Sequence, residues 1–262
     1  MSLVYTAIVP HPPIIIAEIG GDQILAVRGT ISSMKKIAES FNELEIDTAL
    51  VISPHAKLSN FAMTICRPKQ YQGDLSEFGK ETPIISFRPD TEIADDLIIE
   101  SEKSNTPISL DEDGTLDHGA LVPLYFINKA VDFNFNLVEI GYSGLSIEQH
   151  LDFGHLIHKV AKNSKKRVAL ITSGDLSHRH FDNYYKKYAL EFDSIIKNKI
   201  LSGYISGIEQ TDPELVELSG ECGFRSLVIA SGVLNQEKNK FRFLSYEAPF
   251  GVGYLVADLV NG

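Results

Sequence analysis

Cysteine and tryptophan are scarce in this sequence of 262 residues, which has no tryptophan and two cysteines, Cys66 and Cys222. Two cysteines far apart argue against a disulfide-stapled secreted domain and suit a reducing compartment, so we expect a cytoplasmic protein. Basic residues are also few: 24 Lys and Arg stand against 35 Asp and Glu, and the net charge is −11. This balance argues against a surface for nucleic acid or an anionic membrane. No run reaches the roughly 18 apolar residues of a membrane span, and we expect neither a signal peptide nor a transmembrane helix.

Segments typical of strands and helices alternate along most of the chain. Apolar, β-branched runs predict buried strands at 4–9, 47–52, 135–140 and 167–172. Helical spacing of apolar residues predicts helices at 22–44, 91–104, 146–161 and 183–201. Shorter extended pieces are expected at 61–65, 84–87 and 107–110, and we interpret residues 66–83 as a surface excursion. Two closing runs, 241–248 and 253–260, predict an antiparallel hairpin at a sheet edge.

The composition, with 44% hydrophobic and 23% charged residues, is that of a globular protein with a sizeable core. The sequence contains no internal repeat and no linker-like stretch. It therefore predicts a single α/β domain over residues 1–262, with a largely parallel, helix-flanked mixed sheet and antiparallel C-terminal strands.

Three of the predicted strands are each followed by a histidine. His11 lies among prolines after the first strand, His55 directly follows a proline after the second, and His178 lies at the tip of the turn after 167–172. The carboxyl ends of parallel strands share one edge of a sheet, where open α/β folds bind ligands. We therefore expect the three imidazoles to meet at that edge. Imidazole suits Fe, Zn, Cu or Ni, so the pattern predicts a site for a divalent transition metal.

Two predicted helix starts supply further candidates. Asp117 and His118 precede an apolar run, so His118 is either a group of the site or a packed neighbour of a capping Asp117. The turn Gly220–Gly223 presents Glu221 or Cys222 at the start of another apolar helix, where an anionic oxygen or sulfur is stabilised. A buried structural cysteine is the alternative interpretation of Cys222.

Weaker metal candidates lie elsewhere in the chain. Glu247 precedes the turn of the predicted C-terminal hairpin. His155 and His158 are three residues apart on a predicted helix and share a face. The polar residues of that amphipathic helix are, however, expected to be solvated.

Four motifs in order resemble those of the class III (LigB-type) extradiol ring-cleavage dioxygenases: Val9-Pro-His-Pro-Pro13, Ser53-Pro-His55, Asp117-His-Gly-Ala-Leu-Val-Pro-Leu124 and Ser173-Gly-Asp-Leu-Ser-His178. The resemblance spans nearly the whole chain and is closest to the uncharacterised prokaryotic branch related to the Memo proteins. It implies Fe(II) held by His11, His55 and a carboxylate. It also implies that His178 is the acid–base catalyst and that His118 contacts the substrate or O2. The implied reaction opens a catechol-like ring next to its diol.

The third ligand departs from the dioxygenase pattern. The dioxygenases carry glutamate in a Gly-x-Glu-Gly-like turn, whereas alignment on Gly223 puts Cys222 in that place and Glu221 one residue early. The Memo proteins have a cysteine at this position. With Cys222 as ligand, the site is softer and favours Cu or Zn over Fe(II). With Glu221 as ligand, the dioxygenase set is restored.

Three functions therefore stay open. The first is an Fe(II)-dependent oxygenase that uses O2 and a small aromatic substrate. The second is a Memo-like metal-binding protein that acts through redox chemistry or a protein partner, without ring cleavage. The third is a metal hydrolase with zinc-bound water and His178 as the base. A homo-oligomer, or a partner equivalent to the second domain of some relatives, is open as well.

Overall fold

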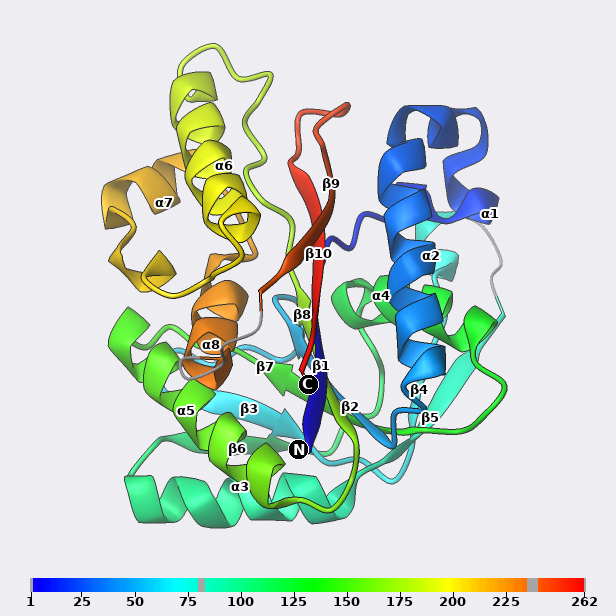
Figure 1. Cartoon of the computed structure of the whole chain (residues 1–262), viewed down its shortest axis with the longest axis vertical. Coiled ribbons are helices and arrows are strands. Elements are labelled where there is room, and N and C mark those ends of the chain that lie inside the picture. Colours follow the sequence, from blue (N-terminus) through cyan, green and yellow to red (C-terminus); the bar gives the residue numbers. More distant parts are fainter. Residues whose placement is uncertain (1, 80–82, 235–239, 262) are drawn as a thin grey trace.

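The computed structural model describes residues 2–79, 83–234 and 240–261 (Figure 1). Its strands are β1 (Leu3–Val9), β2 (Thr48–Ser53), β3 (Met63–Cys66), β4 (Tyr71–Gly73), β5 (Ile85–Pro89), β6 (Ile108–Asp111), β7 (Asn136–Gly141), β8 (Val168–Ser173), β9 (Arg242–Glu247) and β10 (Tyr254–Val260). Its α-helices are α1 (Ala17–Gly20), α2 (Arg28–Glu43), α3 (Thr91–Ser104), α4 (His118–Ala130), α5 (Ile147–Asn163), α6 (Lys186–Leu201), α7 (Pro213–Ser219) and α8 (Phe224–Leu234). Short 3-10 segments cover Pro13–Ile15, Gly21–Val27, Ser76–Phe78 and Ile208–Gln210.

The strands form one mixed sheet whose centre is parallel. The order is β4-β5-β7-β2-β8-β1-β10-β9, and β3 pairs with both β6 and β7. The neighbours β5, β7, β2, β8 and β1 all run in the same direction. Their continuous apolar sequences suit strands that are covered on both faces. The α/β fold class and the largely parallel, helix-flanked sheet predicted from the sequence are thereby confirmed.

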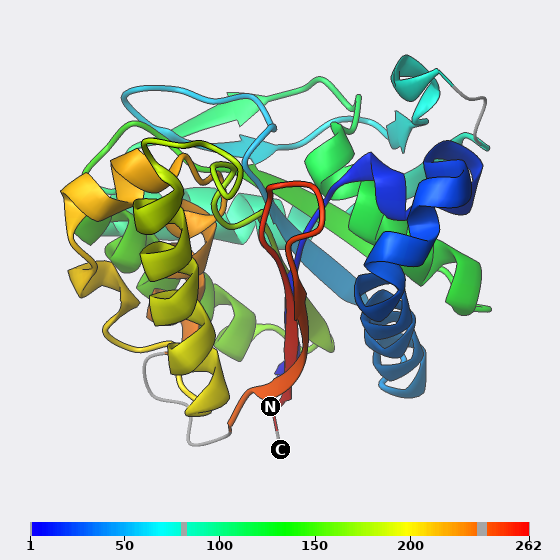
Figure 2. The ribbon, with the colours of Figure 1, turned by 90° about the horizontal axis from the view of Figure 1, so that it is seen from above.

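Helices cover both faces of the sheet, and the sheet divides the hydrophobic core into two parts (Figures 1 and 2). Leu170 of β8 belongs to the core on the side of α3, α5, α6 and α8. The next residue, Ile171, belongs to the core on the side of α2 and α4, because successive side chains of a strand point to opposite faces. Both side chains are fully buried, and burial of one such side chain stabilises the fold by about 1.5–3 kcal/mol.

The C-terminal strands behave as the sequence predicts. β9 and β10 pair in antiparallel fashion, and β10 attaches antiparallel to β1, so that β9 forms an edge of the sheet. The stretch 66–83, in contrast, is not simply the surface excursion that the sequence suggested, as its described part, 66–79 and 83, shows; residues 80–82 lie outside the described residues. The described part contains β4 and the fully buried Tyr71, whose hydroxyl donates to the carbonyl of Cys66 and accepts from the backbone N–H of Glu139. Glu139 is 68 positions away in the chain, so local sequence gives no sign of this burial.

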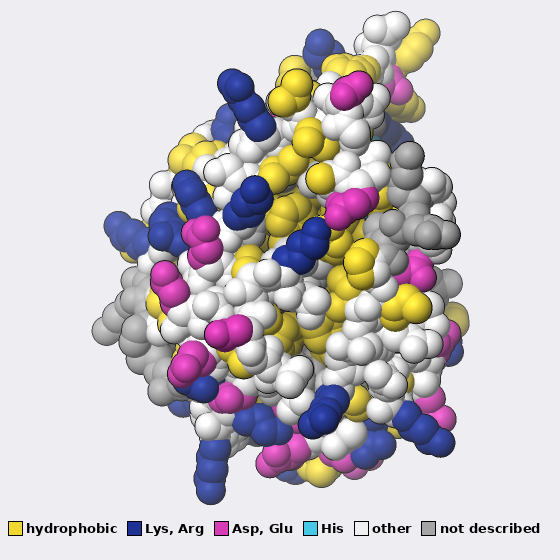
Figure 3. Space-filling view, turned by 90° about the vertical axis from the view of Figure 1, so that its right-hand side faces the viewer, with side chains coloured by type: hydrophobic (Ala, Val, Ile, Leu, Met, Phe, Trp, Pro, Cys, Tyr) yellow, Lys and Arg dark blue, Asp and Glu magenta, His cyan; other side chains and the backbone are white. Residues whose placement is uncertain are grey.

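One face of the molecule carries a concentration of apolar side chains. Figure 3 shows hydrophobic side chains in the middle of the α2–α4 side, with charged side chains around them. A groove of about 460 Å³ lies there and is lined by residues that include Ile15, Ile31 and Phe126. Within the described ranges, none of the helices combines the length and apolar character that crossing a membrane requires.

Candidate metal centre

His11, His55 and His118 meet at the carboxyl edge of the sheet. His11 lies two residues after β1 and His55 two residues after β2, and β8 separates these strands. His118 is the first residue of α4, and the Asp117 side chain caps this helix by accepting from two backbone N–H groups. The ligand nitrogens of the three histidines all lie within 4.8 Å of one another.

The Nε2 atoms of His11 and His55 are placed to bind a single metal ion. These atoms are 3.1 Å apart, and the ring centroids of His55 and His118 are 4.2 Å apart. A metal ion binds imidazole nitrogen at about 2.0–2.1 Å, so one ion is able to reach both Nε2 atoms across this separation. The donor set therefore fits a divalent transition metal, for which imidazole is a common ligand.

The hydroxyl of Ser173 selects the tautomer of His11. Ser173 Oγ donates its one proton to the carbonyl of Gly119 at 2.6 Å, and it lies 2.9 Å from His11 Nδ1. The hydroxyl must therefore accept from His11, so Nδ1 carries the proton. Nε2 then keeps its lone pair toward His55, which is the arrangement that a metal-binding histidine uses.

Burial favours the neutral forms of His11 and His55. Burial is the main cause that lowers the pKa of His11 well below its ordinary value, and the charges of His55 and His118 lower it further. Burial and the charge of His118 also lower the pKa of His55. Neutral imidazole is the form that binds metal, so lowered pKa values favour metal binding by His11 and His55.

A second serine at a strand end orients the loop of His55. Ser53 Oγ donates to Asp117 Oδ1 at 2.7 Å and accepts from the backbone N–H of His55 at 3.2 Å. The same Asp117 oxygen accepts from the N–H of Gly119. A side chain at Gly119 would place its Cβ 2.4 Å from Ser53 Oγ, so glycine allows the start of α4 to approach β2.

Cys222 approaches His11 from the turn between α7 and α8. Its Sγ lies 3.7 Å from His11 Nε2, and it accepts from the backbone N–H of Asp175 at 3.3 Å. The turn reaches the end of β8 because two glycines face each other: a Cβ on Gly174 would lie 2.2 Å from the Cα of Gly223. Burial and the neighbouring Asp175 raise the pKa of the Cys222 thiol.

The Glu221 carboxyl is hydrogen-bonded to the start of the helix that follows it. It accepts a hydrogen bond from the backbone N–H of Phe224 in the first turn of α8. Burial raises the pKa of Glu221 to about 7. Of the two residues that the sequence offers as a third ligand, the structure brings Cys222 beside His11 and attaches Glu221 to the start of α8.

His178 is not one of the three grouped histidines. It follows β8 and is exposed to solvent. It is three residues from Asp175, whose carboxylate accepts from the backbone N–H of His11, so the loop that carries His178 begins at this edge of the sheet. The ends of β1 and β2 therefore bring His11 and His55 together, and the first residue of α4, His118, completes the close group, which does not include His178.

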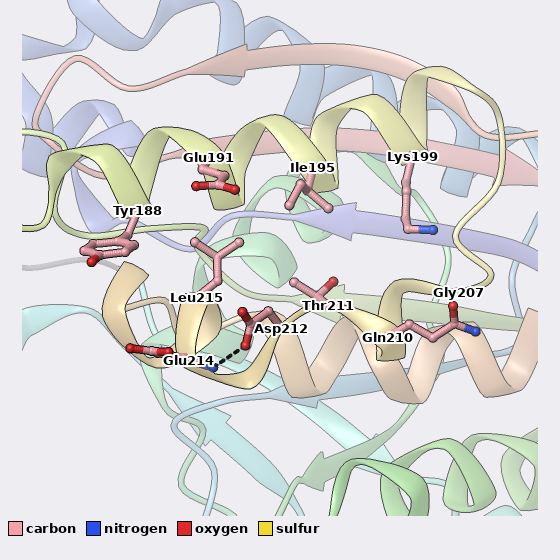
Figure 4. Close-up of a pocket in the computed structure, with 10 residues that line it drawn as sticks. All are labelled: Tyr188, Glu191, Ile195, Lys199, Gly207, Gln210, Thr211, Asp212, Glu214 and Leu215. Atoms are coloured by element: carbon pink, nitrogen blue, oxygen red, sulfur yellow. Dashed lines mark hydrogen bonds between the residues drawn. The ribbon is translucent and has the colours of Figure 1, made fainter.

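The weaker sequence candidates lie apart from this centre. The Glu247 carboxylate accepts from the backbone N–H groups of Gly29 and Thr30, so it caps the start of α2. His158 on α5 contacts the carbonyl of Val233 through Nδ1 at 2.7 Å. A further cavity of about 430 Å³ lies between α6 and α7 (Figure 4), and its lining includes none of the histidines, Cys222 or Glu221 that the sequence singled out.

Sequence reasoning missed the groups that hold the ligands in place. Asp175 accepts from the backbone N–H of His11 through Oδ1 at 3.0 Å, and burial raises its pKa to about 6. Ser53 and Ser173 act through their hydroxyls as described above. The available signal was that each serine is the last residue of a buried strand, immediately before a segment with a candidate histidine.

Comparison with known proteins supports one family over almost the whole chain. The family described as the catalytic LigB subunit of aromatic ring-opening dioxygenase matches residues 5–257. The 3,4-dihydroxyphenylacetate 2,3-dioxygenase of Escherichia coli is 25% identical over 263 residues, covering 90% of this chain and 92% of that protein. An uncharacterized Escherichia coli K12 protein of known structure superposes with a TM-score of 0.66 at 14% identity, covering 97% of this chain and 99% of that one.

Two further relatives are longer than this chain. Protein CA_C1420 of Clostridium acetobutylicum is 29% identical over 271 residues, which cover 99% of this chain and 58% of that protein. A MEMO1 family protein of Methanococcus maripaludis strain C5 is 31% identical over 171 residues, which cover 63% of this chain and 54% of that protein. The present chain thus spans little more than half the length of the clostridial relative.

Proposed function

Because the chain belongs to the family of the catalytic LigB subunit of aromatic ring-opening dioxygenases, we propose that it is a metal-dependent extradiol dioxygenase for a catechol-type aromatic. The observation that carries this proposal is the group of three histidines whose ligand nitrogens lie within 4.8 Å of one another. The Escherichia coli relative is named for a dihydroxylated aromatic substrate. A small aromatic with adjacent hydroxyls, together with O2, is the reactant pair that we assign to this chain.

His11 and His55 would hold the metal, with Cys222 or Glu221 as the third ligand. We assign Fe(II), with Zn or Cu as the alternatives if the thiol takes part. When bound, the metal supplies the Lewis acidity and redox chemistry that catechol cleavage by O2 requires. Ser173 supports this role by keeping His11 Nε2 unprotonated.

Two further histidines act on the substrate in this proposal. His178 accepts a proton from a catechol hydroxyl at an imidazole nitrogen and later returns it to the product. Its exposure lets that nitrogen exchange protons with solvent between turnovers. His118 lies against His55, with ring centroids 4.2 Å apart, and contacts the bound ring or O2. The buried side chain of His11 excludes water from the side of the site that faces the sheet.

Anaerobic loading with Fe(II), followed by oxygen uptake across a panel of catechols, tests the proposal. We expect oxygen consumption together with the absorbance of a ring-opened product. His55→Ala, which removes one of the two facing Nε2 atoms, should lose both the iron and the oxygen uptake. Absence of turnover in a protein confirmed to hold iron contradicts the assignment.

The position of Cys222 supports a second candidate function, a Memo-like metal-binding protein that works through redox chemistry or a protein partner. Its thiol lies 3.7 Å from His11 Nε2, and MEMO1 family proteins are among the relatives. Metal analysis of the wild type and of Cys222→Ala separates the two functions. This alternative requires that loss of the thiol changes the bound metal, and unchanged occupancy and identity would remove its basis.

A further inference from the structure

The orientation of the His178 imidazole depends on the position of the backbone that carries it. The residue is exposed, and across the described ranges no hydrogen bond engages its ring. Its backbone N–H donates to the carbonyl of Ser219 at 3.3 Å. Because the ring has no hydrogen-bond partner of its own, its position is determined by the residues on either side.

Asp193 of α6 binds the loop on both sides of His178. Its Oδ1 accepts from the backbone N–H of Ser177 at 2.9 Å, and its Oδ2 lies 2.7 Å from His180 Nε2. Oδ2 also accepts from the hydroxyl of Tyr246 on β9 at 2.6 Å. Asp193 and His180 are both buried, and hydrogen bonds to a buried carboxylate are about twice as strong as neutral ones.

The turn between β9 and β10 leaves room for the Asp193 carboxylate. This turn pairs with the loop: Gly253 N donates to Ser177 O at 2.9 Å, and His180 N donates to Gly251 O at 3.1 Å. A side chain at Gly253 would place its Cβ 2.2 Å from Asp193 Oδ2. The glycine thus leaves the space in which the carboxylate reaches the loop.

Asp193 is on a different side of α6 from the cavity between α6 and α7. Glu191 and Ile195 point toward that cavity in Figure 4. Asp193 is two residues from each, which is about 200° around a helix. The carboxylate therefore faces the sheet and the His178 loop, where the proposed chemistry takes place.

From this geometry we propose that Asp193 is a positioning residue for His178: it binds the backbone of Ser177 before it and the side chain of His180 after it, and so fixes the loop that presents the imidazole. This inference rests on the proposed function, in which His178 transfers protons. Burial and the Asp193 carboxylate raise the pKa of Tyr246, so its hydroxyl remains a donor and the carboxylate remains the acceptor.

Asp193→Asn in the iron-loaded protein tests the proposal. The amide keeps the volume but replaces an oxygen that accepts from the loop or from Tyr246. We expect kcat for catechol cleavage to fall roughly 10–100-fold with KM nearly unchanged, because a proton-transfer group is misplaced. The matched control is Tyr246→Phe, which removes the bond from β9 and keeps both bonds to the loop. It should retain most of the activity.

A double-mutant cycle distinguishes positioning from a general loss of structure. If Asp193 acts through His178, Asp193→Asn should cause no further loss in a His178→Ala background. An equal loss with and without His178 would overturn the proposal, as would unchanged kcat in Asp193→Asn. Should Asp193→Asn fail to fold, the same cycle with His180→Phe, which removes the bond after His178 and keeps a ring in its place, decides in the same way.

NMR of the metal-free protein gives a readout that does not depend on activity. We expect the ring signals of His178 to shift in Asp193→Asn and to stay in place in Tyr246→Phe. Unchanged His178 signals in Asp193→Asn refute the positioning role, whether or not the protein cleaves catechols. Absence of ring cleavage with shifted signals would instead remove the proposed function and leave the positioning of His178 in place.

Discussion

The thiol of Cys222 lies 3.7 Å from Nε2 of His11, although 211 positions separate the two residues in the chain. The contact exists because Gly174 and Gly223 allow the α7–α8 turn to pack on the end of β8. Asp175, next to Gly174, then binds both partners: its carboxylate accepts from the N–H of His11, and its own N–H donates to Cys222 Sγ. The end of β8 therefore aligns a thiol and an imidazole toward the same point.

Glu221→Ala should lower stability without changing metal binding. The carboxyl caps the first turn of α8, and loss of a cap typically costs about 1 kcal/mol. Urea denaturation gives the free energy of unfolding, and chelator competition gives the metal affinity. Glu191→Ala on the surface of α6 is the control for a lost surface charge. A large loss of metal affinity would show instead that Glu221 turns toward the histidines when the ion binds.

Ser173→Ala should weaken metal binding by about 10–100-fold, which is the usual effect of removing a group that orients a ligand histidine. Without the hydroxyl, His11 Nδ1 loses its acceptor and the ring loses its preferred tautomer. Metal affinity is measured by chelator competition at constant pH. Ser109→Ala serves as the control, because its hydroxyl bonds to Thr64 in the β3–β6 pair. Equal affinities for wild type and Ser173→Ala would contradict this role.

Gly174→Ala should destabilise the protein by about 1–3 kcal/mol, the usual cost of overpacking. The new methyl group would lie 2.2 Å from the Cα of Gly223, so the α7–α8 turn must move away and carry Cys222 with it. Urea denaturation measures the stability, and the alkylation rate of Cys222 measures its exposure. Stability equal to the wild type would mean that the turn is not held by this contact.

Glu139→Gln should increase stability most at high pH. Burial, with the charge of Asp117, raises the pKa of Glu139 well above its ordinary value. In the unfolded chain it ionises near pH 4.3, so above that pH the folded state holds a proton that the unfolded state has lost. Stability then falls with rising pH by up to about 1.4 kcal/mol per pH unit until the folded pKa is reached.

Urea denaturation of the metal-free protein at several pH values between 4 and 8 measures this effect. Gln lacks the titrating group, so the two proteins should be similar at pH 4 and the difference should grow with pH. Parallel curves for the wild type and Glu139→Gln would exclude Glu139 as the source of the pH dependence.

The sequence by itself determined the α/β class, the order of most elements and the positions of His11 and His55 after buried strands. These features depend on local information, because strand and helix periodicities appear in the order of residues and proline fixes the backbone around a histidine. The antiparallel C-terminal hairpin followed for the same reason. The burial of Tyr71 could not be predicted in this way, because it depends on β7, which is distant in the chain.

Only the tertiary structure decided which side chains meet. It placed His118 with His11 and His55, turned Cys222 toward His11 and attached Glu221 to α8. Neighbouring residues in a tight turn point in different directions, and which of them faces inward depends on what packs against the turn. Here that packing is the contact of Gly223 with Gly174, between segments almost fifty residues apart, which no local pattern encodes.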